Sequence, residues 1–493
     1  MASVSHDPGA QSAPADADAL APQVWPAGAR RDEAGRIEIG GLDAVALAGR
    51  FGTPLYVVDE ADARARARRT RLAFESAAHA AGTDVTVYYA GKAFLSGEVV
   101  RWVTGEGLAV DVCTGGELAV ALAAGAEPAR IGFHGNNKSL AEIARAVEVG
   151  VGALIIDSEV EIERVAEAAA RAGRRQRVRL RVNSGVHAST HEFLATSHED
   201  QKFGVPLERA VELGNRIRAH ASLEFLGLHC HIGSQIFDAE GFAESASRLL
   251  AAHAALAAVE PLPELNLGGG FGIAYTSADT PQPIEEIADG IVSAVVEGCR
   301  DRGIPIPRLA FEPGRSIIGP AGVTLYTVGT VKPVPVEGGT RRYVSVDGGM
   351  SDNARTALYG ADYTARVANR ASAAEPALSR VVGKHCESGD IVVDVEHLPA
   401  DTAPGDLLAV AATGAYCWSL ASNYNHVPRP PVVAVRDGEA RVIVRGESID
   451  DLLARDLGLG ASEAASEPDA ATAVDDATGT PAATRTTTEG NPA

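Results

Sequence analysis

Short runs of hydrophobic, β-branched and aromatic residues alternate with longer segments of helical period through the middle of the chain. Eight of the short runs are strand candidates, and they begin at Val85, Leu108, Arg130, Ala153, Arg177, Phe225, Glu264 and Arg308. Helical patterns separate consecutive runs. Eight strands that alternate with helices over roughly 230 residues predict a (β/α)8 TIM barrel, an α/β fold with a parallel sheet closed on itself.

Two of the helical segments carry end signals as well as the right period. The segments SLAEIARAVEVG from Ser139 and SEVEIERVAEAAARAG from Ser158 each start with Ser, have Glu three residues later and have Gly near the end. A Ser side chain at this position accepts a hydrogen bond from the first helical turn, and the Glu returns one to the Ser backbone. We therefore expect two capped helices here.

The pattern changes after Pro320 to closely spaced β runs without long helices. These runs are VTLYTVGTVKPV, RRYVSVDG, RVVGKHC, LLAVAAT, VVAVRDG and EARVIVRG, and they predict a mainly β domain. The earlier runs GRIEIGG and LYVVDE are expected to add strands to it. The N-terminal end is rich in Ala, Asp, Pro and Ser, and the C-terminal end lacks almost all large apolar side chains, so we expect both ends to be disordered. The predicted divisions are an N-terminal tail (1–22), a segment that contributes to the β domain (23–59), the barrel (60–319), the β domain (320–455) and a C-terminal acidic tail (456–493).

The composition of the chain argues against several classes of protein. The chain has 493 residues and a formal charge of -21, from 44 Lys and Arg against 65 Asp and Glu. Such a field repels nucleic-acid phosphates and anionic lipid, so we expect neither partner. No leader pattern or membrane-spanning apolar run is evident, which predicts a cytoplasmic protein. The five cysteines are widely spread and lack CxxC spacing, which argues against disulfides and a cysteine zinc site.

Polar residues and glycines gather where the predicted barrel strands end. The active sites of such barrels are built at the carboxyl ends of the strands, so these positions are candidates for chemistry. They are Lys92, Asp111, His134, Asp157, Asn183, His231, Gly268, Gly269, Gly270 and Glu312.

Lys92 follows a buried strand in the run VYYAGKA. Partial desolvation there is expected to lower the pKa of its ammonium group and to favour imine formation with a carbonyl. The alternative is a lysine whose ammonium reaches solvent at a strand end, and position alone does not decide between the two.

The segments LNLGGGFG and EPGR suggest how a phosphorylated cofactor would be held. The three glycines would let backbone N–H groups approach an anion, although a glycine run can also be an ordinary turn. In EPGR, Glu312 would hold a pyridine nitrogen in its protonated form, or else form a surface ion pair with Arg315.

The positions of two histidines and one cysteine are compatible with several functions. His229 and His231 in HCHIGSQ lie on one face of a strand, so metal binding must be weighed, but we find no third ligand spaced to complete a site and expect no metal. A histidine stacked on a cofactor ring, or packed in the core, fits better. Cys386, next to Glu387, is either a reacting group or a buried thiol.

Several motifs occur in order along the chain and together resemble the diaminopimelate decarboxylase family. The motifs are YYAGKA, HGNNKS, THEFLATSHEDQKFG, HCHIGSQ, GGGFGIAY, EPGRS, VDGGMSDNARTALYG, CESGD and GAYCWSLASNYN. The resemblance implies a barrel that binds pyridoxal 5'-phosphate, a β domain, and a homodimer with shared active sites. It also implies conversion of meso-2,6-diaminopimelate to L-lysine and CO2, the last step of lysine biosynthesis, through an imine between substrate and cofactor. A Pro usual in the family is missing near Ser184.

The resemblance also implies roles for individual residues. Lys92, Glu312, His231 and Cys386 would be catalytic: Lys92 as the Schiff-base lysine, Glu312 at the pyridinium nitrogen, His231 stacked on the ring and Cys386 influencing reprotonation from the neighbouring subunit. Asp111 would support the cofactor. The phosphate cradle would comprise Ser234, Gly268, Gly269, Gly270, Gly314, Arg315 and Tyr416. The substrate contacts would be Arg315, Arg355, Tyr359, Glu387 and Tyr416.

Other functions share parts of this pattern. A decarboxylase for ornithine, arginine or carboxynorspermidine is the main alternative, but two arginines suit a substrate with a second carboxylate. A racemase is disfavoured because Glu312 implies an electron-poor pyridinium. A carrier of pyridoxal phosphate would lack the β domain, and an inactive barrel would have lost some of these residues.

Overall fold

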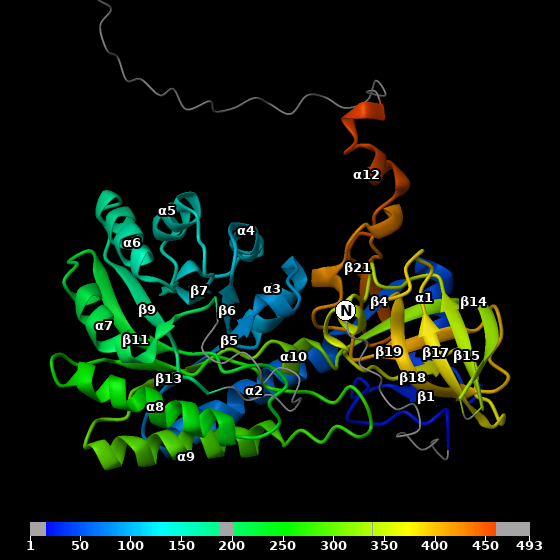
Figure 1. Ribbon diagram of the computed structural model, residues 1–493, viewed down its shortest axis with the longest axis horizontal. Helices are drawn as coiled ribbons and strands as arrows, with labels where there is room; N and C mark the ends of the chain where they lie inside the picture. Colours follow the sequence, from blue (N-terminus) through cyan, green and yellow to red (C-terminus); the bar gives the residue numbers. More distant parts are fainter. Residues whose placement is uncertain (1–15, 187–201, 338, 460–493) are drawn as a thin grey trace, which may run out of the picture. The chain divides into compact units, whose positions relative to one another are not determined.

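A computed structural model of the chain describes residues 16–186, 202–337 and 339–459. These residues belong to two compact units, one that ends at Glu447 and one that begins at Ser448. The first unit contains a barrel and a second large sheet (Figure 1).

The barrel has eight parallel strands that close on themselves, because the last strand pairs with the first. Each predicted run contains one strand, so the predicted fold class is confirmed. Along the ring the strands are β5 (Val85–Ala90), β6 (Ala109–Val112), β7 (Ile131–Phe133), β8 (Ala153–Ile156), β9 (Gln176–Asn183), β11 (Leu223–His229), β12 (Glu264–Asn266) and β13 (Arg308–Phe311). A two-residue strand, β10 (Val205–Pro206), pairs with β9.

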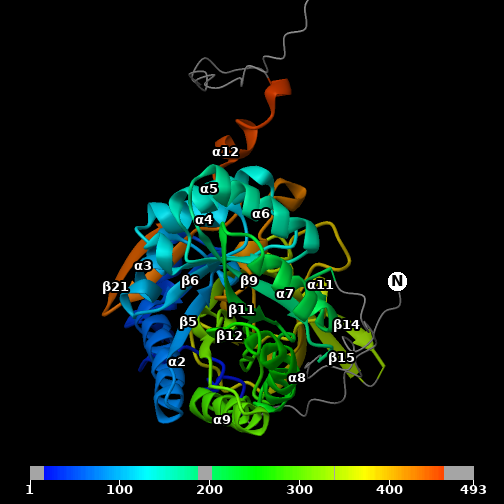
Figure 2. The ribbon, with the colours of Figure 1, turned by 90° about the vertical axis from the view of Figure 1, so that its left-hand side faces the viewer.

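Helices surround the strands (Figure 2). They are α2 (Glu60–Ala80), α3 (Gly97–Gly105), α4 (Gly115–Ala123), α5 (Leu140–Val149), α6 (Glu159–Arg171), α7 (Ala210–Arg218), α8 (Glu240–Ala257) and α9 (Ile284–Arg302), with the short α10 (Arg315–Ile318) after the last strand. Helix α5 has the predicted capping box between Ser139 and Glu142, and it ends at Gly150 in the left-handed conformation. The predicted side-chain cap of α6 is wrong. Ser158 is at the N-cap position of α6, but its side chain makes no capping hydrogen bond, and the Glu161 carboxylate accepts from the backbone of Asp157 and from Lys138.

Alternation along the strands decides which side chains enter the barrel. Phe311 points outward and stacks on Phe74 of α2, with ring centroids 4.0 Å apart. Neighbouring residues of a strand point to opposite faces, so Ala310 and Glu312 turn inward. Tyr89 likewise packs outside the barrel, while Tyr88 joins Ala310 in a small apolar cluster inside it.

The second sheet of the first unit has nine strands and mixed pairing. Its strands are β4 (Leu55–Asp59), β14 (Gly322–Val336), β15 (Gly339–Val346), β16 (Ala365–Val367), β17 (Pro376–Val382), β18 (Ile391–Pro399), β19 (Leu407–Ala411), β20 (Val432–Arg436) and β21 (Glu439–Val444), with helix α11 (Arg355–Tyr359) between β15 and β16. The early run LYVVDE forms β4, which pairs with both β14 and β20 as predicted. Strands β16 and β18 had no counterpart among the predicted runs.

The N-terminal segment departs from its prediction. GRIEIGG supplies β2 (Ile37–Ile39), but β2 pairs with β1 (Arg30–Arg31) and β3 (Leu42–Asp43) in a separate small sheet that precedes α1 (Ala44–Phe51). Its buried isoleucines share a core with residues of the large sheet, so the segment joins the β domain by packing rather than by strand pairing. Part of the predicted tail makes contacts too, because Asp18 forms an ion pair of 3.1 Å with Arg31.

The second unit contains α12 (Ile449–Leu453), which Ser448 and Asp451 cap with a capping box. The remaining parts of the two predicted tails, residues 1–15 and 460–493, lie outside the described residues. None of the described helices is long and apolar enough to span a membrane. All five cysteines are free thiols.

Candidate active site

Five buried polar side chains meet at the carboxyl ends of the barrel strands. They are Asp111 of β6, His134 after β7, His229 of β11, Asn266 of β12 and Glu312 after β13. The strands are parallel, so their carboxyl ends lie at one mouth of the barrel, as the sequence predicted for Asp111, His134 and Glu312.

Glu312 is the acceptor at the centre of this group. Its Oε1 accepts from the side-chain amide of Asn266 at 2.7 Å and lies 3.1 Å from Nε2 of His134. Its Oε2 lies 3.1 Å from Nε2 of His229. Burial alone would raise the pKa of Glu312, but the two histidines outweigh it, and the pKa is well below the usual value. Glu312 is therefore an anion.

The histidines beside Glu312 are neutral. Burial lowers the pKa of His134 to about 3, and it also lowers the pKa of His229. No Lys or Arg of the described residues forms an ion pair with Glu312. Its negative charge is thus stabilised by hydrogen bonds without being neutralised, which leaves it available to a cationic group of a ligand.

His229 belongs to a group of possible metal ligands that the sequence did not suggest. Ligating atoms of His134, His229 and Glu312 lie within 4.8 Å of one another, whereas His231 is outside this group. However, the Nε2 atoms of both histidines face the Glu312 carboxylate, and a neutral imidazole that donates from Nε2 cannot bind a metal through that atom. We interpret the cluster as support for Glu312.

Lys92 lies just after β5, in a short turn from Gly91 to Ala93. Its side chain is solvent-accessible at the barrel mouth and has no hydrogen bond or ion pair among the described residues. Burial by the surrounding protein lowers its pKa, but Tyr416 and Asp111 outweigh this effect and the net shift is upward. The predicted lowering of the Lys92 pKa is therefore wrong, because acidic side chains from several elements face this lysine.

Asp111 and His231 complete the surroundings of Lys92. Burial, and then the charge of Glu312, raises the pKa of Asp111 well above its usual value. Burial and then Lys92 hold the pKa of His231 well below its usual value, so this imidazole is neutral. A neutral imidazole suits the predicted stacking position on an aromatic ring.

The glycines at 268–270 are required by close packing. A Cβ added to Gly268 would lie 2.3 Å from the carbonyl oxygen of Cys230, and one on Gly269 would lie 2.1 Å from that of Glu312. Gly268 and Gly270 also have φ of 69° and 119°, which favour glycine. Among the described residues no acceptor binds the N–H groups of Gly269 and Gly270. Two backbone donors are thus available to an anion, as a phosphate cradle requires.

Arg315 borders the same cradle. Its Nη2 donates to Oγ of Ser234 at 2.9 Å, and its Nη1 donates to the hydroxyl of Tyr275. Gly314 lies against β5, where a Cβ would come within 2.9 Å of the Ala90 carbonyl oxygen. The donors and glycines predicted for a phosphate therefore have the chemistry to hold pyridoxal phosphate.

A second guanidinium faces the same tyrosines. The Cζ of Arg355 lies 5.5 Å from the ring centre of Tyr275, 5.6 Å from that of Tyr416 and 5.7 Å from that of Tyr359, while Arg315 lies 4.7 Å from the Tyr416 ring. No carboxylate of the described residues forms an ion pair with either arginine. The pair is available to anionic groups of a ligand.

Tyr416 connects this region to Lys92. Its backbone has a φ of 62°, which is uncommon for a residue other than glycine, and its N–H donates to the carbonyl oxygen of Ala93 at 2.8 Å. The turn that carries Lys92 and the tyrosine that covers both arginines are therefore held together.

Cys386 and Glu387 are not brought into this group. Both are exposed, and their contacts are with Asn425, whose Oδ1 accepts from the backbone of Cys386 at 3.0 Å, and with Tyr424, whose hydroxyl donates to Glu387 at 3.5 Å. Within the described residues, neither is bonded to a residue at the barrel mouth. Most of the motif THEFLATSHEDQKFG lies outside the described residues.

Sequence reasoning missed Asn266 and Tyr275, and it assigned no role to His134. A signal existed for His134 and Asn266, because each ends a predicted barrel strand. Tyr275 follows the glycines by five residues and carried no comparable signal.

Comparisons with known proteins agree with this site. Residues 65–319, just over half of the chain, match the family described as pyridoxal-dependent decarboxylase, pyridoxal binding domain. The chain is 51% identical over 447 residues to a diaminopimelate decarboxylase of Mycobacterium tuberculosis, covering 89% of this chain and 98% of that protein. It is 44% identical over 440 residues to a diaminopimelate decarboxylase of Bacillus subtilis, covering 87% and 97%.

Solved structures give the same result. A diaminopimelate decarboxylase from M. jannaschii, in complex with L-lysine, superimposes with a TM-score of 0.81 at 31% identity, and the match covers 87% of this chain and 97% of that one. The family match covers the barrel, and the matches to the relatives and to the solved structure extend over both the barrel and the second sheet. The chain belongs to the diaminopimelate decarboxylase family of pyridoxal-phosphate-dependent enzymes.

Proposed function

We propose that this protein converts meso-2,6-diaminopimelate to L-lysine and CO2 with pyridoxal phosphate held at the barrel mouth. One observation carries the proposal: the same mouth holds a lysine, a carboxylate that no cation neutralises and two arginines without carboxylate partners. The relatives described above are named diaminopimelate decarboxylases, and a similar enzyme of that name was solved in complex with L-lysine.

Different residues of the mouth would bind different parts of the cofactor. Lys92 would be its covalent attachment point, and His231 and Asp111 would lie against its ring. The N–H groups of Gly269 and Gly270, together with Ser234, Gly314, Arg315 and Tyr416, would bind its phosphate. When bound, pyridoxal phosphate supplies a carbonyl for the substrate amine and an electron sink for the bond that breaks.

Glu312 determines which reaction is favoured. Its carboxylate stays ionised because His134, His229 and Asn266 donate to it, so it stabilises a proton on the ring nitrogen of the cofactor. A protonated ring withdraws electrons strongly, which favours decarboxylation over racemisation.

Lys92 holds a proton at Nζ whenever its amine is free, because its pKa is raised. With the cofactor bound, Lys92 could therefore deliver a proton near the reacting carbon. The two arginines and Tyr359 would bind carboxylates of the substrate. Because diaminopimelate carries a carboxylate at each end, Arg315 and Arg355 favour it over ornithine or arginine, which carry one.

We propose a homodimer in which Cys386 and Glu387 complete the site of the partner. Their exposure, and the absence of a bond to the mouth of their own chain among the described residues, support this arrangement. Glu387 would bind the substrate ammonium and Cys386 would affect proton return. The cytoplasmic location remains a prediction from sequence.

The substrate is tested by incubating the purified protein with pyridoxal phosphate and meso-diaminopimelate and measuring lysine and CO2. Equal amounts of both products are expected. Turnover of ornithine or arginine in place of diaminopimelate would contradict the substrate assignment. The shared site is tested by mixing the Lys92→Ala and Cys386→Ala proteins, each of low activity. Subunit exchange should restore roughly a quarter of the wild-type activity if one functional site forms in each mixed dimer. No recovery after exchange would contradict the shared site.

A further inference from the structure

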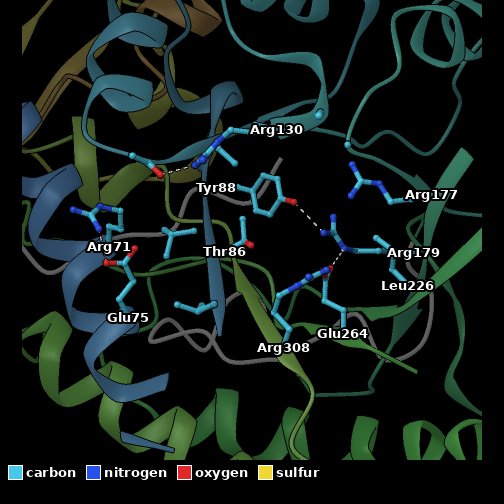
Figure 3. Close-up of a pocket in the computed structure, with 16 residues that line it drawn as sticks. Arg71, Glu75, Thr86, Tyr88, Arg130, Arg177, Arg179, Leu226, Glu264 and Arg308 are labelled. Carbon is cyan, nitrogen blue, oxygen red and sulfur yellow. Dashed lines mark hydrogen bonds and ion pairs between the residues drawn. The ribbon is translucent and has the colours of Figure 1, made fainter. Parts of the chain in front are cut away.

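A cavity lies at the opposite end of the barrel from Lys92. It has a volume of 310 Å3 and is lined by residues at the amino ends of the strands, such as Thr86 and Tyr88 of β5 and Arg177 and Arg179 of β9 (Figure 3). Because the strands are parallel, this end of the barrel is separate from the mouth that carries Lys92 and Glu312.

The lining of this cavity is cationic. Five arginines line it against two glutamates, which leaves a local excess of three positive charges in a chain whose formal charge is -21. The arginines come from α2, from the loop before β7, from β9 and from β13, and they are Arg71, Arg130, Arg177, Arg179 and Arg308.

The buried centre of the lining is Arg179, which is 2% exposed. Its Nε donates to Glu264 and its Nη2 donates to the hydroxyl oxygen of Tyr88 at 2.9 Å. Its Nη1 is buried and has no partner among the described residues. An unsatisfied guanidinium nitrogen in the interior is costly, so an acceptor in the cavity would stabilise this arrangement.

Further donors surround that nitrogen. Tyr88 accepts from Arg179, which leaves the hydroxyl hydrogen of Tyr88 free to donate. Arg177 is two residues before Arg179 on β9, so both point into the barrel, and in Figure 3 their guanidinium groups lie on the same side of the cavity. Among the described residues, the guanidinium of Arg177 has no hydrogen bond or ion pair.

The glutamates of the lining are already engaged. Glu264 binds Arg179 through Oε1 and Arg308 through Oε2, and Glu75 binds Arg71. Within the part of the chain that the structure describes, the Arg130 side chain binds only the carbonyl oxygen of Gly107, at 2.6 Å. Two arginines of the lining, Arg130 and Arg177, are thus left without a carboxylate.

We propose that this cavity binds a small oxyanion with two or more negative charges, either a phosphate or a polycarboxylate. Guanidinium groups bind both through paired hydrogen bonds, and the hydroxyls of Tyr88 and Thr86 can donate to further oxygens. The volume is at the lower end of the range for small-molecule sites, about 300 to 1,000 Å3. The site is independent of the reaction at the other end of the barrel.

The test uses the holoenzyme saturated with pyridoxal phosphate, so that the phosphate cradle at the other mouth stays filled. The cofactor absorbance is recorded throughout. Inorganic phosphate and citrate are titrated separately by calorimetry in 0.15 M salt, conditions that screen weak surface binding (Debye length about 8 Å). Saturable binding of one anion per chain is expected for at least one of the two probes, and the probe that binds identifies the source of the oxyanion.

Matched variants locate the binding. Arg177→Ala should weaken it by at least about tenfold, because it removes a charge-assisted donor, and Arg177→Lys should keep part of it. Arg174→Ala, which removes an exposed arginine three residues earlier, should leave it unchanged. Absence of saturable binding for both probes, or equal binding by Arg177→Ala and the wild type, would overturn the proposal. Thermal unfolding of Arg177→Ala checks that the variant is folded.

Discussion

Two buried glutamates on neighbouring strands of the barrel are held in opposite ways. Glu264 begins β12 and is bound by the guanidinium groups of Arg179 and Arg308. Glu312 follows β13 and is bound by the neutral side chains of Asn266, His134 and His229. Both carboxylates are ionised, since both have a lowered pKa.

The two glutamates differ in whether protein cations neutralise their negative charge. At Glu264 protein cations neutralise it, so this carboxylate holds the barrel together at its amino end. At Glu312 hydrogen bonds stabilise the anion without neutralising it, so the charge can act on a ligand. Both glutamate sites use the same pair of parallel strands, β12 and β13. In the register of this pair, Glu264 is opposite Arg308 and Asn266 is opposite Ala310. The partners of a buried carboxylate thus distinguish a structural role from a functional one.

The largest effect should come from removing Lys92, the cation that Glu312 and Asp111 influence. Lys92→Ala should lower kcat by at least about 10⁴-fold, because both the cofactor attachment and a proton carrier are lost. The absorbance band of the lysine-bound cofactor should disappear. Stability of the cofactor-free protein should change little, since Lys92 is solvent-accessible and makes no hydrogen bond among the described residues.

The control for Lys92 is another exposed lysine, Lys332 on β14. Lys332→Ala should keep both the absorbance band and kcat. If Lys92→Ala retained more than a tenth of the wild-type kcat, the assignment of the carboxyl end as the reacting end would fail.

Glu264→Gln should act on stability. An arginine has only donors, so the new amide NH2 group cannot bond to Arg179 or Arg308, and the buried Arg179 loses its counter-charge. Removing one partner of a buried ion pair costs about 3 to 5 kcal/mol, measured as the free energy of unfolding by chemical denaturation of the cofactor-free protein. The kcat of the folded variant should stay within a few-fold of the wild type.

An exposed ion pair provides the comparison for Glu264. Glu163 pairs with Arg216 at the surface, where both side chains are 41% exposed. Glu163→Gln should therefore cost less than about 1 kcal/mol. Equal losses for Glu163→Gln and Glu264→Gln would show that the buried pair has no special structural role.

The sequence predicts features that depend on residues close together in the chain. It does not predict features that depend on contacts between elements far apart in the chain. The eight strands and the position of Glu312 follow from local hydrophobic period and from the rule that chemistry lies at strand ends. The partners of Glu264 and Glu312 do not, because they depend on the register between β9, β12 and β13. The pKa of Lys92 was predicted in the wrong direction for the same reason, since groups from several elements determine it. Local patterns also could not predict which strands pair with GRIEIGG, because burial of its isoleucines is compatible with either sheet.

Glu312→Gln should act on the reaction and less on stability. Its amide can still accept from Asn266, and a neutral histidine can change tautomer to accept from the new NH2 group. We expect kcat to fall by about 10²- to 10³-fold, the usual effect of removing one electrostatic contact to the transition state. The stability loss should be about 1 to 2 kcal/mol, below that of Glu264→Gln. A normal kcat together with a larger loss of stability than in Glu264→Gln would reverse the two assignments.

The smallest effect concerns pH. Burial alone would raise the pKa of Glu264, but Arg179 and Arg308 lower it below its ordinary value. The unfolded chain therefore binds a proton more readily than the folded one, so this glutamate stabilises the fold above its unfolded pKa of about 4.3, and the contribution is lost as pH falls through the folded pKa. The difference in unfolding free energy between the wild type and Glu264→Gln should be equal at pH 7.5 and pH 6. Below about pH 4.3 it should shrink, by up to about 1.4 kcal/mol per unit, as far as both proteins remain folded. A difference that stays constant across this acidic range would mean that the Glu264 charge contributes nothing, and the contrast with Glu312 would then rest on packing alone.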